Sequence, residues 1–175
     1  MDRFVFDQIK KVKPGYELEA RLGTLTHQGF VPGVTKDVFY AMKDRFDIST
    51  CWDTTSSERV RDIIVGQHRN HHHENGLVTC TMKQKVNSKD FDKVRIALCE
   101  EIQCDPVEVQ PTSFTRRKER WSYFKGIWRY DLTHVITANK DVYEIEIELH
   151  DTKKALAYSH EYLTKSFVDK VKQII

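Results

Sequence analysis

Residues 143–150 read Tyr143-Glu144-Ile145-Glu146-Ile147-Glu148-Leu149-His150, and this stretch decides the fold. Strict alternation predicts a β-strand with three glutamates on one face and apolar side chains on the other. Side chains two positions apart on a strand lie roughly 7 Å apart, so the three carboxylates repel one another unless water or cations lie against them. Taken alone, such a strand is most simply explained by a sheet with one solvated face.

A second acidic strand is predicted near the start of the chain. Residues 16–22 read Tyr-Glu-Leu-Glu-Ala-Arg-Leu, which places Glu17 and Glu19 on one face and apolar residues on the other. Two acidic strands in one chain of 175 residues favour a single oxygen-lined cation site over two solvated faces.

Length and composition predict one globular domain over residues 1–175, large enough for a hydrophobic core. Its 28 basic and 26 acidic residues nearly cancel to a net charge of +2, so their positions matter more than their sum. No apolar run approaches membrane-spanning length, and we expect no membrane association. Four cysteines without paired metal spacing, Cys51, Cys80, Cys99 and Cys104, predict reduced thiols of an intracellular protein, although a bridge stays open.

Periodicity predicts three helices, over Asp2–Lys13, Thr35–Phe46 and Thr152–Lys172, the last burying Leu156, Leu163, Phe167 and Val171. Five further strands are predicted between the two acidic ones, over residues 57–63, 77–86, 93–103, 114–124 and 127–135. Residues 23–33 and 68–76 are predicted as turn and loop, with His71–His73 solvated because neighbouring loop histidines lack a fixed geometry for a metal.

The charges are sorted by strand. The first and last strands carry glutamates, whereas the strands between carry Arg59, Arg61, Lys83, Lys85, Arg116, Lys118 and Arg120. Closing the sheet into a barrel would bring the first and last strands together and set an acidic wall against a basic one. Apolar strand faces would then point outward under the helices, with Trp121, Trp128 and Tyr130 packing there. Because buried charges are costly unless paired or solvated, the interior would be a wet channel for a metal and phosphates.

Clustered carboxylates without clustered histidine or thiolate favour Mg²⁺ or Mn²⁺. Arginine and lysine opposite them would bind a polyanion, and a metal with cations around a phosphoryl group stabilises phosphoryl transfer. Hydrolysis of a terminal phosphate is the simplest reaction that fits. The sequence contains no P-loop motif.

The segments 17–21 and 144–148 resemble the paired E-x-E-x-K/R and E-x-E-x-E strands of the triphosphate tunnel metalloenzymes. The chain looks closest to the metal-dependent RNA triphosphatases of fungi, protozoa and large DNA viruses. The run 116–120 is similar to that family's R-x-K-x-R strand, and Asp131 fits its aspartate strand. Arg21 stands where the family often has lysine. The resemblance covers essentially the whole chain.

The resemblance implies an α+β fold with a closed antiparallel eight-stranded β-barrel, a charged interior and flanking helices. Seven strands are clear in the sequence, so the eighth is either Asp47–Trp52 or part of a longer run. The implied activity removes the γ-phosphate of 5′-triphosphate RNA to give 5′-diphosphate RNA, the first step of mRNA capping. A capping guanylyltransferase, in cis or in trans, is then an expected partner, and the nucleus or a viral factory or virion an expected location.

Site roles follow from the same resemblance. Glu17, Glu19 and Glu148 are the expected metal ligands and catalytic residues, with Glu146 as a further metal-site residue. Glu101 is expected to position or deprotonate the attacking water. Glu144, Arg21 and Asp131 would support the acidic wall, and the expected phosphate ligands are Arg59, Lys83, Arg116, Lys118 and Arg120.

Two other classes of function stay open at this stage. A tunnel phosphatase could act instead on tripolyphosphate, thiamine triphosphate or free NTP, and a non-catalytic module could bind polyphosphate or RNA ends without turnover. The oligomeric state is not determined by the sequence.

Overall fold

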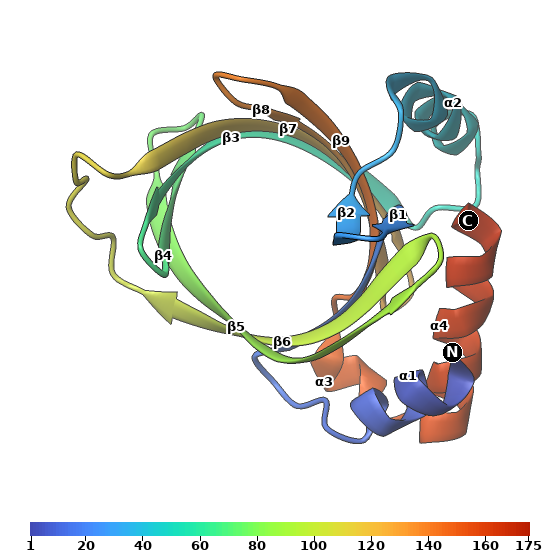
Figure 1. Ribbon diagram of the computed structural model, residues 1–175. Helices are drawn as coiled ribbons and strands as arrows, with labels where there is room; N and C mark the ends of the chain where they lie inside the picture. The colour runs from blue at the N-terminus through green and yellow to red at the C-terminus, as the bar shows by residue number, and fades with distance from the viewer.

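A computed structural model describes all residues from Met1 to Ile175 (Figure 1). Eight antiparallel strands close into a barrel, because β1 pairs with both β6 and β9. The short strand β2 (Gly29–Pro32) pairs only with β1. The predicted closed eight-stranded barrel is therefore confirmed. Around the barrel the strands are β1 (Tyr16–Thr26), β6 (Val94–Cys104), β5 (Val78–Phe91), β4 (His68–His73), β3 (Thr54–Val65), β7 (Phe114–Lys125), β8 (Trp128–Ile136) and β9 (Asp141–Leu149).

The eighth strand is β4, which the sequence predicted as a solvated loop. Asp47–Trp52, the alternative, is instead the end of a helix and the loop after it. His68–His73 has no apolar alternation, so its local sequence gives no strand signal. Pairing with β3 on one side and β5 on the other makes it a strand, which shows tertiary context overriding local preference.

The predicted turn over residues 23–33 contains the β1–β2 hairpin. Gly23 pairs with Pro32 there, and a Cβ at Gly23 would lie 2.3 Å from the carbonyl oxygen of Val31. Only glycine allows this approach of the two strands.

Four helices lie outside the barrel: α1 (Asp2–Ile9), α2 (Lys36–Asp47), α3 (Thr152–Ala155) and α4 (His160–Ile174). Figure 1 shows all of them along one side of the ring, with α1 against α4. The helix predicted over Thr152–Lys172 is broken, since Asp151 caps α3 and Ser159 caps α4. Leu156 lies in the break and is 60% exposed, so its predicted burial is wrong, whereas Leu163, Phe167 and Val171 are buried.

The hydrophobic core lies between the outer barrel face and the helices. Leu18, Ile96 and Ile147 are fully buried there, each stabilising the fold by about 1.5–3 kcal/mol relative to exposure. Trp128 stacks on Phe167 with ring centroids 5.4 Å apart, and Trp121 lies against Phe39. The predicted outward packing of these aromatics is confirmed. The polar strand faces are thereby left to line the barrel interior, called the bore below. None of the helices is both long and apolar enough to cross a membrane.

Candidate active site

Closure of the barrel brings the two acidic strands side by side. Glu19 pairs across the ladder with Glu148, and Arg21 with Glu146. All five predicted glutamates share the bore face, and Glu19, Glu146 and Glu148 are at most 9% exposed. Carboxylates from the two ends of the chain therefore converge in one buried cluster, called the acidic cluster below (Glu17, Glu19, Glu144, Glu146, Glu148).

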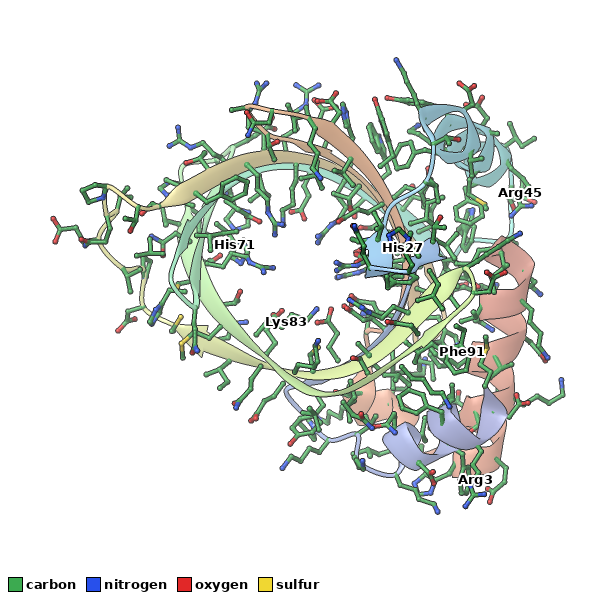
Figure 2. All side chains as sticks on the ribbon, viewed as in Figure 1. Arg3, His27, Arg45, His71, Lys83 and Phe91 are labelled. Carbon is green, nitrogen blue, oxygen red and sulfur yellow. The ribbon has the colours of Figure 1, made fainter.

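Three cations lie against the acidic cluster. Lys83 Nζ is 2.7 Å from both Glu17 Oε2 and Glu19 Oε2, and Figure 2 shows this side chain pointing into the bore. Arg21 Nε donates to Glu146, and Arg21 also lies 4.0 Å from Glu144. Arg129 Nη2 is 2.9 Å from Glu148 Oε1. Lys83 and Arg21 are thus placed at the acidic cluster, while the predicted contact of Lys83 with phosphate stays a prediction.

The carboxyl groups of the acidic cluster differ in pKa. Burial and the negative charge of Glu17 raise the pKa of Glu148 well above its ordinary value. Burial and the negative charge of Glu146 likewise raise the pKa of Glu19. Burial also opposes ionisation of Glu146, but Arg21 and Arg120 lower its pKa to about 2. For Glu17, hydrogen bonding with Glu148 and the charge of Lys83 outweigh burial and lower the pKa. The site therefore holds more carboxyl groups than its cations neutralise.

The acidic cluster has the donor chemistry of a hard divalent cation. Glu17 Oε2 is buried, and it shares the ammonium of Lys83 with Glu19 Oε2. Clustered carboxylate oxygens without nitrogen or sulfur ligands fit Mg²⁺ or Mn²⁺. Lys83 lies between Glu17 and Glu19, and no three His, Cys, Asp or Glu side chains are arranged around a common metal position. Loading of a metal would therefore displace or reorient Lys83.

A basic group lines the bore on β7. Arg116, Lys118 and Arg120 all point inward, as their shared strand face predicted. Arg120 lies 3.6 Å from both Glu58 and Asp131, and Ser122 donates to Asp131 at 2.6 Å. Burial raises the pKa of Asp131, although Arg120 and Arg129 oppose this.

Asp62 organises two of these basic side chains, and its role was not predicted from the sequence. Its carboxylate is fully buried and accepts contacts from Lys118 at 2.8 Å, Arg116 at 3.2 Å and His71 at 2.6 Å. Despite burial, His71 and Lys118 hold its pKa far below the ordinary value. His71 also bonds to Thr81 and points into the bore in Figure 2, so the prediction that it is a solvated loop residue is wrong.

Two inward-facing arginines were not among the predicted site residues. Arg69, on β4, is half-buried beside Arg116, Asp62 and Glu101. Burial and the positive charge of Arg116 lower the pKa of its guanidinium. It makes no ion pair, which leaves its guanidinium free for an anion. Arg129 bonds to Glu148 and Asp131. Had residues 68–73 been predicted as a strand, Arg69 would have been placed on one face with His71. For Arg129, the available signal was that it shares a strand face with Asp131.

Arg59 is the predicted phosphate ligand that the structure places elsewhere. It is on the outer barrel face, its side chain is 70% exposed, and it pairs with Glu119 at 3.4 Å. Its strand, β3, turns Asp62 inward instead, because Asp62 is opposite the inward Arg116 in the ladder. Glu101 does lie on the bore face, opposite Lys83 and half-buried, and its role toward water stays a prediction.

Fold and site together define a class, the triphosphate tunnel proteins, in which a closed barrel surrounds acidic and basic side chains. The family described as "mRNA capping enzyme, beta chain" matches residues 35–174. The chain therefore belongs to that family, the tunnel-type RNA triphosphatases of mRNA capping.

Solved structures give the same fold. S. pombe Pct1 RNA triphosphatase is similar over 99% of this chain and 90% of its own, with a TM-score of 0.75 and 18% identity. The structure of Pct1 in complex with the Spt5 CTD has a TM-score of 0.76 and 17% sequence identity, and the match covers 99% of this chain and 91% of that one. A putative adenylate cyclase from Bacillus halodurans has a TM-score of 0.50 and 17% sequence identity, and the match covers 91% of each chain. No curated protein sequence matches the chain.

Proposed function

We propose that this chain is a metal-dependent RNA 5′-triphosphatase that converts 5′-triphosphate RNA to 5′-diphosphate RNA. The observation that supports this most is the meeting of Glu17, Glu19 and Glu148 with inward cations inside one barrel. A triphosphate brings the negative charge that the basic side of the bore lacks. A divalent cation brings the positive charge that the acidic cluster lacks.

In this proposal each group has one task. Glu17, Glu19 and Glu148, with Glu146, hold Mg²⁺ or Mn²⁺, which when bound would neutralise developing phosphate charge. Arg116, Lys118, Arg120 and the free Arg69 hold the triphosphate oxygens, and Asp62 keeps Lys118 and Arg116 in position. Glu101 orients or deprotonates a water whose oxygen bonds to the γ-phosphorus while the bond to the β-phosphate oxygen breaks.

Release of γ-phosphate from triphosphate-ended RNA, with and without Mg²⁺ or Mn²⁺, tests the proposal. Glu19→Ala and Glu148→Ala should each lower kcat at least about a hundredfold, because they remove charge stabilisation at the reacting group. Glu161→Ala, on an exposed position of α4, is the matched control and should act like wild type. Undiminished activity in both acidic-cluster variants would refute the assignment.

Substrate identity needs a separate panel, because the bore cations contact phosphate irrespective of what the α-phosphate carries. Tripolyphosphate, thiamine triphosphate and NTP should be compared with triphosphate-ended RNA by kcat/KM. A preference for RNA supports a capping role, with a guanylyltransferase as the partner that uses the diphosphate end. Tight binding of all of them without turnover would instead identify a binding module.

A further inference from the structure

The outer barrel face carries two arginines whose charges are not compensated. Arg61 on β3 and Arg117 on β7 are directly opposite each other in the ladder, and both are exposed. The ion pair on this face joins Arg59 to Glu119, and neither Arg61 nor Arg117 has a carboxylate within 4.0 Å. Like charges directly opposite on a sheet destabilise it, so this pair has a cost that an anion would remove.

A histidine completes the group, called the outer patch below (Arg61, His72, Arg117). His72 pairs with Arg61 from the β4 side, and its Nε2 is buried without a hydrogen-bond partner. The outer patch lines a hollow of about 400 Å³ together with Arg59, Glu74 and Glu119. Two unpaired guanidinium groups and an unsatisfied ring nitrogen around one hollow suit a phosphate group.

The outer patch lies near one mouth of the bore. Phe114, the first residue of β7, shares the inward face of Arg116 and is 49% exposed. Arg117 is three residues from it, roughly 10 Å along the strand. The acidic cluster's Glu148 is near the opposite mouth, because the end of β9 aligns through β8 with the end of β7. Along β7, Arg120, Lys118 and Arg116 therefore lead from Glu148 toward Phe114.

We propose that the RNA chain leaves the bore at this mouth, stacks a base on Phe114 and places a backbone phosphate on the outer patch. This rests on the proposed function, since a triphosphate held with its γ-phosphate at the acidic cluster directs its nucleoside end along β7. Phe114 at the mouth and the outer patch on the outer face are separated by roughly two nucleotides' length along β7, and aromatic rings that stack bases together with cations that hold the backbone are how proteins bind single-stranded nucleic acid. RNA rather than a phosphorylated peptide is the expected ligand, because the nucleoside end of the proposed substrate already points toward this mouth.

The test compares Arg61→Gln/Arg117→Gln with wild type on two substrates, triphosphate-ended RNA of about 12 nucleotides and tripolyphosphate. KM for RNA should rise roughly tenfold, and the salt slope of RNA affinity should fall by about 0.7, because the two arginines together hold one backbone phosphate and that contact is lost. The KM and kcat for tripolyphosphate should stay unchanged. Phe114→Ala should raise KM for RNA alone, and Phe114→Trp should restore it.

Arg3→Gln/Arg45→Gln is the matched control, because both residues are exposed on helices (Figure 2) and neither lines the hollow of the outer patch. It removes the same charge and should leave KM for RNA unchanged. The double variant of the outer patch should also unfold no more easily than wild type, since it removes a repulsion. An equal KM for RNA in wild type and the double variant would refute the outer patch, as would a loss confined to binding of a phosphopeptide.

Binding of an RNA of the same length with a 5′-hydroxyl end separates the two proposals. If wild type releases phosphate from tripolyphosphate but not from RNA, the proposed function fails. The outer patch then still predicts weaker binding of the 5′-hydroxyl RNA to the double variant than to the control, and equal binding would refute it independently.

Discussion

The two sides of the bore handle buried charge in opposite ways. In the acidic cluster, Glu19 and Glu148 are crowded by other carboxyl groups, and their pKa values are raised by burial and those neighbours. On the basic side, the single carboxylate of Asp62 is shared by Lys118, Arg116 and His71, and its pKa is lowered. One side thus holds carboxyl groups at a cost, while on the other Lys118, Arg116 and His71 depend on one carboxylate for their positions. Neutralising a carboxyl group should therefore have opposite effects on stability in the two places.

The largest effect on stability is expected at Asp62. Asp62→Asn leaves Lys118, Arg116 and His71 facing one another without an anion, and breaking such a buried pair costs about 3–5 kcal/mol. Urea unfolding measures this loss. Asp62→Asn combined with Lys118→Met should recover part of it, because the most buried cation is removed as well. Wild-type stability in Asp62→Asn would contradict the organising role of this carboxylate.

Glu148→Gln should separate stability from activity. Because burial and Glu17 disfavour the ionised carboxyl, the variant should unfold at the same or higher urea concentration than wild type without divalent cations. Its phosphate release should fall at least about a hundredfold. Stabilisation by added Mn²⁺ should also be weaker than in wild type, which thermal unfolding can measure. Clear destabilisation of the metal-free variant would remove the contrast with Asp62.

Stability without divalent cations should depend on pH in two arms. The pKa values of Glu19 and Glu148 are raised in the folded protein, so as pH rises these two groups ionise in the unfolded chain before they ionise in the folded one. The free energy of unfolding therefore falls as pH rises above the ordinary value of 4.5. The lowered pKa of Asp62 acts oppositely. Its contribution is complete above 3.8 and is lost as pH falls below that value. Glu148→Gln should flatten the upper arm and Asp62→Asn the lower one in urea titrations across this range.

The smallest effect is expected at Arg59. Arg59→Gln removes an exposed ion pair with Glu119, which is worth about 0–1 kcal/mol and lies outside the bore. Turnover of tripolyphosphate should stay within about twofold of wild type, whereas Arg120→Gln should lower it at least about tenfold. Equal losses in the two variants would contradict their placement on opposite barrel faces.

Local alternation alone determined which side chains share a face. The period of two on β1, β7, β8 and β9 made the acidic cluster, the inward Arg116, Lys118 and Arg120, and the outward aromatics predictable. This worked because apolar residues marked the opposite face of most of these strands, and the helices needed a face to cover.

Which strand face points into the bore, and the presence of the eighth strand, depended on tertiary pairing. On β3 both faces are polar, so nothing local shows whether Arg59 or Asp62 points inward, and the register with β7 settles it. The polar run His68–His73 becomes a strand only because β3 and β5 supply its hydrogen-bond partners, and that pairing turns Arg69 and His71 into the bore. The residues of a strand determine what its two faces carry, but the register with the neighbouring strands determines which face lines the bore.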